Sequence, residues 1–202
     1  MIYLVRHGQT EANAARLIQG QSDRPLTDLG RRQAAALAAV LAVALPAGAP
    51  VVTSPLRRAR ETAAAIGPAG AAAIVDDRWI EIDYGDFEGK PIDDVRHLAQ
   101  TGWAEDVHWA PPNGESMASA AARVAAACDE LLARAPADVI VVTHVNPIKL
   151  AVAWALAASP RIGFRMFVHL ASITTIAVSA DGRPVLTGFS ALPGSGTGGT
   201  AG

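Results

Sequence analysis

The chain alternates between short apolar runs and longer segments in which apolar residues recur every three or four positions. The short runs, rich in valine and isoleucine, predict β-strands, and the spacing of three and four predicts α-helices. Strands are expected at residues 2–5, 51–53, 71–75, 139–143, 172–179 and 185–189. Helices are expected at residues 11–17, 27–45, 55–66, 92–100, 116–134 and 147–157.

Cap and turn residues set several of these boundaries. Thr27 is expected to cap one helix and Ser54-Pro55 to begin another, because proline suits the first helical position. Asp181-Gly182 is typical of a tight hairpin turn between the last two strands. Residues 139–143 are apolar almost throughout, which predicts a strand buried on both faces of a sheet.

Strands that alternate with helices predict an α/β protein. The expected architecture is a three-layer α/β/α sandwich, with a mostly parallel central sheet and an antiparallel strand pair at the C-terminal end. A chain of 202 residues, half of them hydrophobic, has enough apolar surface for one domain, expected at residues 1–192. The Gly/Ser/Thr-rich tail at residues 193–202 is expected to be disordered.

Composition narrows the classes of function. The net charge of −2 argues against a nucleic-acid partner, since such proteins are usually basic. The single cysteine, Cys128, falls on an apolar helical stripe, so it is expected in the core, and it cannot form an internal disulfide. No stretch predicts a signal peptide or a membrane span. The expected protein is cytoplasmic, and its oligomeric state stays open, with a homodimer as one option.

The candidate chemistry lies where strands end. The first strand ends at Arg6-His7-Gly8, the buried strand 139–143 ends at His144, and the strand 51–53 is followed by Arg57-Arg58. Since the carboxyl ends of parallel strands meet at one edge of a sheet, these side chains are expected to converge. Arginine suits a phosphate dianion, because its planar fork donates several hydrogen bonds. His7 is therefore predicted to attack phosphorus and Arg6 to hold the phosphate, although the tripeptide alone also fits an ordinary strand end.

Together the motifs resemble those of the histidine phosphatase superfamily, the phosphoglycerate-mutase-like group, in the family's order over residues 2–190. The stretches that carry the resemblance are Arg6-His7-Gly8 with Asn13, Gly20 and Pro25-Leu26-Thr27; residues 54–63, with Ser54, Leu56 and Arg58; residues 81–89, from Glu81 to Gly89; Gly114-Glu115-Ser116; and Thr143-His144.

The resemblance implies a role for each matching position. His7 would take the phosphoryl group as a phosphohistidine, while Arg6, Arg58 and His144 would line the phosphate. Glu81 would protonate the leaving oxygen, and no metal or cofactor is required. The family spacing selects Arg58 over its neighbour Arg57. The further substrate contacts that the resemblance implies are Gly8, Asn13, Gln19, Gly20 and Val145.

Physical chemistry supports this division of roles. A neutral imidazole attacks through one nitrogen, so an acceptor must hold the other as N–H. An alkoxide leaves poorly, so Glu81 must be protonated when the ester bond breaks and can activate water afterwards. Three acidic neighbours of Glu81, at positions 83, 86 and 88, are expected to raise its pKa.

For single residues, purely structural roles stay open as alternatives. Glu81 alone could be a solvated acid and His144 a core histidine, while Asn13 and Gln19 could equally be cap or loop residues. By analogy with the family, Glu115 is expected to cap the helix that follows it. His97, His108 and His169 match no motif and are expected to be structural or exposed.

Val145 departs from the glycine that the family often has after its second histidine. This version resembles the branch that contains α-ribazole phosphatases and broad-specificity phosphatases. The predicted function is thus a metal-independent phosphomonoesterase acting on small-molecule phosphate esters.

Two rivals are a cofactor-dependent phosphoglycerate mutase and a non-catalytic module that binds phosphate ligands. The mutase is disfavoured because residues 90–143 contain only three arginines, Arg96, Arg123 and Arg134. Trp103, His108 and Trp109 are predicted to form a lid that sets substrate choice.

Overall fold

The computed structural model describes residues 1–45, 48–67, 72–134 and 138–194. Its centre is a sheet of six strands in the order β3-β2-β4-β1-β5-β6. The first four in this order run parallel, whereas β5 is antiparallel to both β1 and β6. The strands are β1 (Ile2–Arg6), β2 (Val51–Thr53), β3 (Ile74–Val75), β4 (Val139–Thr143), β5 (Ile173–Val178) and β6 (Pro184–Ala191).

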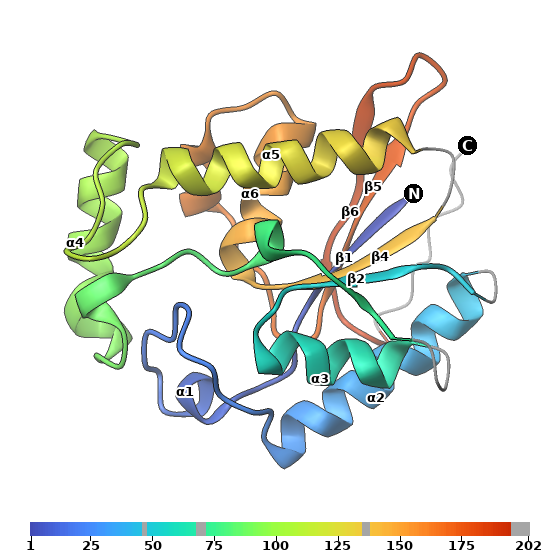
Figure 1. Ribbon diagram of the computed structural model, residues 1–202, viewed down its shortest axis with the longest axis horizontal. Helices are drawn as coiled ribbons and strands as arrows, with labels where there is room; N and C mark the ends of the chain where they lie inside the picture. Colours follow the sequence, from blue (N-terminus) through green and yellow to red (C-terminus); the bar gives the residue numbers. More distant parts are fainter. Residues whose placement is uncertain (46–47, 68–71, 135–137, 195–202) are drawn as a thin grey trace.

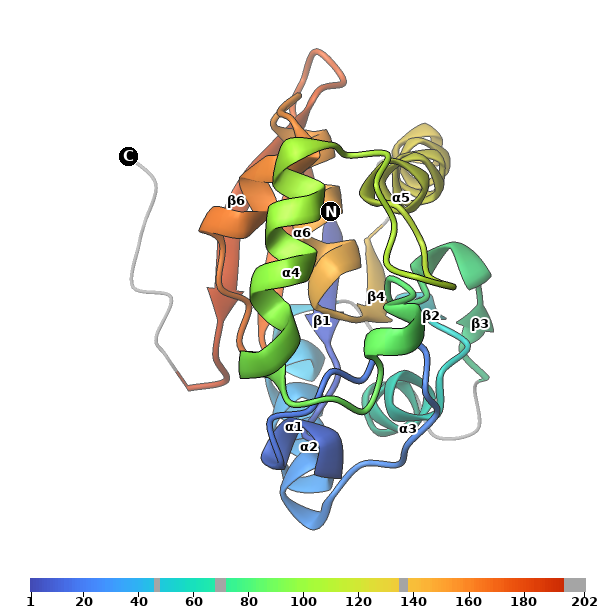
Figure 2. The same cartoon turned by 90° about the vertical axis from the view of Figure 1, so that its left-hand side faces the viewer.

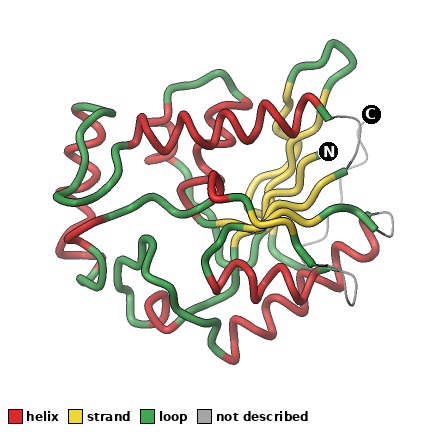
Figure 3. Tube along the Cα trace, viewed as in Figure 1, coloured by secondary structure: helices red, strands yellow, loops and turns green. Residues whose placement is uncertain are grey.

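Helices cover both faces of this sheet. In Figure 1, α2 and α3 lie on one side of the strands and α5 and α6 on the other, and Figure 3 shows the same three layers by colour. The predicted three-layer sandwich with an antiparallel C-terminal pair is therefore confirmed. The helices are α1 (Glu11–Ala14), α2 (Asp28–Ala44), α3 (Arg57–Ile66), α4 (Ile92–Glu105), α5 (Met117–Ala133) and α6 (Val145–Ala155), with short 3₁₀ helices η1 (Asp77–Trp79), η2 (Gly85–Phe87) and η3 (Pro160–Arg165).

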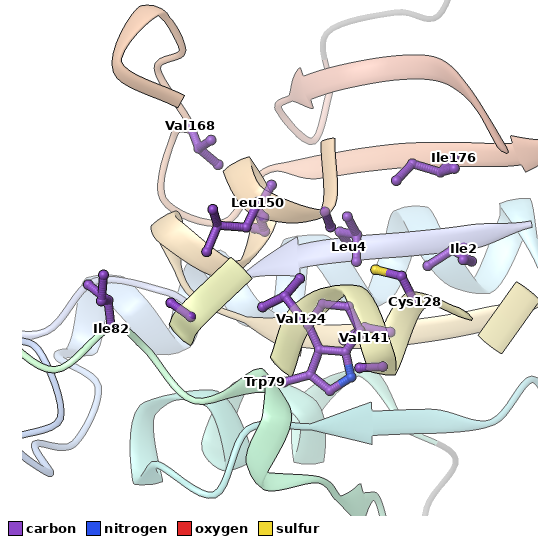
Figure 4. Packing of buried hydrophobic residues seen from close by; sticks show 14 of the residues in the cluster. Ile2, Leu4, Trp79, Ile82, Val124, Cys128, Val141, Leu150, Val168 and Ile176 are labelled. Atoms are coloured by element: carbon purple, nitrogen blue, oxygen red, sulfur yellow. The ribbon is translucent and has the colours of Figure 1, made fainter. Parts of the chain in front are cut away.

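Two apolar clusters, one on each face of the sheet, form the core. Alternation along the strands divides them, because successive side chains of a strand point to opposite faces. Leu4 and Val141 pack towards α5 and α6, and Val5 and Val142 pack towards α2 and α3. Figure 4 shows the first cluster, in which Cys128 lies close to Val124 and Leu4. Cys128 is a free, buried cysteine, as its position on the apolar stripe predicts.

The strand register positions the candidate site. Arg6 of β1 lies opposite Thr143 of β4, so His7 and His144 leave adjacent strands at the same level. The His7 backbone N–H donates to the Thr143 carbonyl at 3.1 Å, and the Ser54 N–H after β2 donates to the Val142 carbonyl at 3.0 Å. Three strand ends therefore deliver their next residues to one edge.

Several predicted boundaries are wrong. The third helix begins at Arg57 and not at Pro55, with Leu56 at the N-cap and no side-chain cap bond. The Ser54 hydroxyl lies close to His144 instead, and it accepts only a long bond from Leu56 N–H. The helix predicted at 147–157 begins at Val145 and ends at Ala155, with His144 at its N-cap.

Other predictions need smaller corrections. The α4 helix continues to Glu105, into a segment predicted to be irregular, and the segment 79–89 contains η2. Ser116 caps α5, whereas Glu115 pairs with Arg123 and is not the cap. The strand predicted at 71–75 forms only at Ile74–Val75, and its first residue lies outside the described residues, as does most of the predicted disordered tail. In the described part of the chain, no helix has the length and apolar character of a membrane span.

Candidate active site

Two imidazoles and one guanidinium form the centre of the site. The rings of His7 and His144 lie 5.1 Å apart between centroids and are tilted by 59°. The Nε of Arg58, from the first turn of α3, lies 3.3 Å from Nε2 of His7 and 3.2 Å from Nδ1 of His144. All three side chains are buried. The predicted convergence of two distant histidines on one edge is therefore present.

The hydrogen bonds select one tautomer for each ring. Nδ1 of His7 lies 2.7 Å from the Gly8 carbonyl, which can only accept, so Nδ1 carries the hydrogen and Nε2 keeps its lone pair. His144 has the opposite arrangement, because its Nδ1 accepts from Arg58 and its Nε2 then donates to Ser54 Oγ at 2.7 Å. His7 thus presents a nucleophilic nitrogen towards Arg58.

Burial keeps both rings neutral. Desolvation is the largest cause that lowers the pKa of His7 well below its ordinary value, and the cations of Arg58 and Arg6 lower it further. The pKa of His144 is lowered for the same reasons, burial first and Arg58 second. An unprotonated imidazole is the form that can attack an electrophile.

Two further donors at this edge lack partners. Arg6 donates through Nη1 to the Val168 carbonyl at 2.6 Å, but its Nε is buried and makes no hydrogen bond to the described residues. The Gln19 side chain lies 2.7 Å from Thr10 Oγ1 through its oxygen, and its buried Nε2 is likewise unpartnered there. Burial lowers the pKa of Arg6 to about 10, so the guanidinium stays charged at neutral pH. Unsatisfied buried donors are costly, and a bound anion would satisfy them.

Glu81 is the buried carboxyl of the site. Its Oε1 accepts from the backbone N–H groups of Ile82, at 2.8 Å, and Asn146, at 3.3 Å. Burial raises its pKa, although the Ile82 hydrogen bond and the Arg58 cation act in the opposite direction. The predicted rise is present, but its cause is desolvation and not the neighbouring acids. Asp83 and Asp86 bind Gly85 N–H and Asn113, and Glu88 binds another loop.

The other predicted substrate contacts stay predictions, and the structure shows which contacts each residue makes within the protein. Gly8 makes a close approach, since a Cβ there would lie 2.4 Å from the Gly30 carbonyl oxygen. Gly20 offers its carbonyl to Arg58 Nη2 at 2.6 Å. Val145 is half-buried in the first turn of α6. Asn13 completes a capping box with Thr10 and thereby uses its side-chain oxygen in the cap of α1.

Sequence reasoning missed four residues that shape the site. Ser54 binds His144, and its signal was its place directly after a strand, which also fitted a helix cap. Asn146 contacts Glu81 through its backbone and donates from Nδ2 to the Tyr84 hydroxyl at 3.1 Å. Glu88 binds the loop that holds Arg58. Tyr84 and Glu88 lie inside the matching stretch 81–89 and Asn146 lies beside Thr143-His144, but no separate signal marked the roles of these three residues.

Residues predicted to lie outside the centre do so. Arg57 is exposed and pairs with Glu61 at 2.6 Å. The three histidines without a motif are exposed: His97, His108 and His169.

The predicted lid residues form an aromatic series with Tyr84. Trp103 is buried and lies 5.5 Å from Tyr84 and 5.9 Å from Trp109 between ring centroids, whereas His108 is exposed. Figure 2 shows α4, which carries Trp103, in front of α6 and β1. Their role in substrate choice stays a prediction.

Comparisons with known proteins identify the family to which this fold belongs. The profile of the histidine phosphatase superfamily (branch 1) matches residues 2–190, and the chain belongs to this superfamily. A bifunctional protein of Mycobacterium tuberculosis is 36% identical over 186 residues, which are 90% of this chain and 51% of that protein. The chain therefore spans about half the length of this curated relative.

Solved structures agree over nearly the whole chain. The mycobacterial glucosyl-3-phosphoglycerate phosphatase in complex with VO3 is 34% identical, with a TM-score of 0.82 over 94% of this chain and 98% of that one. The α-ribazole phosphatase of Shigella flexneri is 23% identical, with a TM-score of 0.81 over 94% and 96%. The latter shares the fold, and membership in its branch stays a prediction.

Proposed function

We propose that the chain is a phosphomonoesterase that hydrolyses small-molecule phosphate esters through a phosphohistidine on His7. One observation carries the proposal: the Nε2 lone pair of His7 faces the buried Arg58 guanidinium, while buried donors of Arg6 and Gln19 lack partners among the described residues. A neutral nucleophile beside preorganised positive charge is the arrangement that phosphoryl transfer needs, because positioning and electrostatics supply most of its rate.

In the first step, Nε2 of His7 attacks phosphorus and the bond from phosphorus to the ester oxygen breaks. Glu81 gives its proton to the leaving oxygen, and the raised pKa of this carboxyl favours the protonated form that the step requires. Arg6 and Arg58 bind the phosphoryl oxygens, and His144 lines the phosphate, where it can donate a hydrogen bond only after its Nδ1 takes up a proton. The Nε of Arg6 and the Nε2 of Gln19 gain in that anion the partner they lack.

In the second step, water attacks the phosphohistidine, Glu81 accepts the proton of that water, and the nitrogen–phosphorus bond breaks. Inorganic phosphate leaves and His7 returns to its neutral tautomer. The Gly8 carbonyl holds the Nδ1 hydrogen throughout, so the attacking nitrogen keeps its identity.

The test is phosphate release from a panel of metabolite esters with a chelator present, comparing wild type with His7→Ala. The panel includes glucosyl-3-phosphoglycerate, the substrate in the name of one structural relative. Wild type should release phosphate and form an acid-labile phosphoprotein, and His7→Ala should do neither. Undiminished cleavage by a folded His7→Ala variant would refute the proposal.

The mutase rival predicts transfer to a second acceptor. Two of the three arginines between Lys90 and Thr143 are engaged elsewhere, since Arg123 binds Glu115 and backbone carbonyls and Arg134 pairs with Glu130. These contacts support hydrolysis. A mutase rate above the rate of phosphate release, measured on phosphoglycerate, would reverse the choice.

The setting of the activity is part of the proposal. We infer a single catalytic domain that binds phosphate esters without a metal or cofactor. We also infer that it works in the cytoplasm, because Cys128 is a free thiol, which fits a reducing compartment. Light scattering coupled to size-exclusion chromatography tests the homodimer option.

A further inference from the structure

The guanidinium of Arg58 is held by the loop Gln19–Ser22 on the side away from the histidines. Nη2 donates to the Gly20 carbonyl at 2.6 Å, and Nη1 donates to the Ser22 carbonyl at 2.9 Å. These two bonds leave Nε directed at His7 and His144. Because a guanidinium is planar, fixing both terminal nitrogens also fixes the direction of Nε–H.

A carboxylate holds the other side of the same loop. Glu88 accepts from the Gln21 N–H through Oε1 at 2.6 Å and from the Ser22 N–H through Oε2 at 2.9 Å. Hydrogen bonds to an ionised acceptor are shorter and stronger than neutral ones. Both oxygens are therefore committed to successive backbone groups of the loop that carries the Arg58 acceptors.

The loop is built for this carboxylate. Gly20 has a φ of +51°, and a Cβ there would lie 1.8 Å from Oε1 of Glu88, so a side chain would collide with the carboxylate. Glu88 forms no ion pair with any described residue, although it is within electrostatic range of Arg58. A solvated surface carboxylate would not need a glycine at position 20 to make room for it.

We propose that Glu88 is a positioning residue: its carboxylate orders the loop Gln19–Ser22, whose carbonyls aim the Arg58 guanidinium at the two histidines. The inference rests on the proposed function of His7 and adds a residue that acts through Arg58. Glu88 does not act on the substrate itself, because its two oxygens are occupied and the buried acid of the site is Glu81.

The first test is Glu88→Gln, which keeps the shape but replaces one acceptor oxygen with a donor that faces a backbone N–H. A displaced Arg58 should lower kcat/KM by up to about 100-fold, since small errors of position are costly in catalysis. Inorganic vanadate, which would occupy the phosphate position, should bind more weakly by a similar factor. Glu61→Gln is the matched control, because Glu61 also accepts a backbone N–H, from Leu26 at 2.9 Å, but does not touch the loop.

The second test follows the titration of His7 by NMR, with His7→Ala for assignment. The groups that face this ring are Arg58, Arg6 and His144, and both cations lower its pKa. Loss of the Glu88 charge by itself would lower the pKa of the ring further. A rise in the Glu88→Gln variant therefore means that the guanidinium has moved away or that solvent has reached the ring, and both follow when the loop no longer closes the site.

The outcomes separate cleanly. Weaker vanadate binding together with an upward shift of the His7 titration supports the proposal. If Glu88→Gln folds poorly, Glu88→Asp takes its place: it keeps the charge, so its vanadate affinity and its His7 titration should lie closer to those of the wild type. Wild-type vanadate affinity and an unmoved titration in a folded Glu88→Gln variant would overturn it. If wild-type protein cleaves no ester, the proposed function fails, while the NMR titration still tests Glu88.

Discussion

At the scale of single residues, Arg58 has no equivalent on the same helix turn. Its neighbour Arg57 has the same chemistry but is exposed and pairs with Glu61. Arg58 is buried and joins two histidines and two loop carbonyls through three nitrogens, and burial lowers its pKa to about 10. Position decides the difference, because residue 58 points into the sheet edge and residue 57 into solvent.

Replacing Arg58 with lysine should therefore strongly reduce activity, although the positive charge is kept. Lysine has one donor group and cannot reach both carbonyls and both imidazoles at once. We expect kcat/KM to fall by about 10²–10³-fold, the size of effect seen when a preorganised donor to a reacting anion is lost. Arg57→Lys should change kcat/KM less than about twofold, and similar losses in the two variants would contradict this account.

The pH dependence of kcat/KM should report His7 and Glu81. Activity needs neutral His7 and protonated Glu81, so it should fall on the acid side as His7 gains a proton and on the basic side as Glu81 loses one. The acid limb should lie well below pH 6.5, because the pKa of His7 is lowered. The basic limb should lie above pH 4.5, because burial raises the pKa of Glu81.

Glu81→Gln supplies the control for that profile. An amide does not ionise, so the basic limb should disappear and the rate for an alkyl ester should fall by about 10²–10⁴-fold. The kcat/KM for an aryl phosphate, which reports the formation of the phosphohistidine and whose leaving group needs no proton, should fall much less. A basic limb that persists in Glu81→Gln would assign it to another group.

At the scale of elements, the close approach of the β1 end and α2 shapes the phosphate edge. A Cβ on Gly8 would lie 2.4 Å from the Gly30 carbonyl oxygen, and the Gly8 N–H donates to Thr62 Oγ1 of α3 at 3.2 Å. Three elements thus meet at one glycine. Its amide hydrogen bond keeps the residue after His7 in place.

Gly8→Ala should accordingly shift backbone and not merely a side chain. We expect a loss of about 1–3 kcal/mol in the free energy of unfolding, the range for overpacked sites, together with lower activity. Gly163→Ala is the comparison, since the closest atom to its added Cβ would be Lys149 Cβ at 3.3 Å, a contact that needs far less adjustment than one at 2.4 Å. Urea denaturation measures both, and equal costs would argue against a rigid contact at Gly8.

At the scale of the whole molecule, the neutral buried histidines link stability to pH. Both folded-state pKa values lie below the ordinary 6.5. Below pH 6.5 the unfolded chain therefore binds protons at these two imidazoles, while the folded protein keeps both rings neutral. Stability should therefore rise from pH 5 to pH 6.5 by up to about 1.4 kcal/mol per unit for each imidazole. Glu81, with its raised pKa, makes stability fall as the pH rises above 4.5, but it is one group against two imidazoles.

Urea midpoints between pH 5 and 7.5 measure that slope. His144→Asn should reduce it, because one of the two titrating imidazoles is gone, whereas the exposed His97→Asn should leave it unchanged. A wild-type stability that is flat over this range would mean that the folded protein and the unfolded chain bind the same number of protons, which would contradict the lowered pKa values of the two histidines.

The pattern of apolar residues determined much of this molecule. Strands β1, β2 and β4, the cap Thr27, and the order of alternating elements followed from local spacing, because a buried face imposes its period on the chain. The motif positions also placed His7 and His144 at strand ends, with Arg58 in the segment that follows a third strand.

Only the tertiary structure decided how these groups are held. Burial, and not the nearby acids, raises the pKa of Glu81. The bonds of His144 to Ser54, of Ser22 to Glu88 and of Arg58 to Gly20 join residues 38 to 90 positions apart. Desolvation and hydrogen-bond direction depend on neighbours in space, and the local spacing of residues in the sequence does not specify those neighbours.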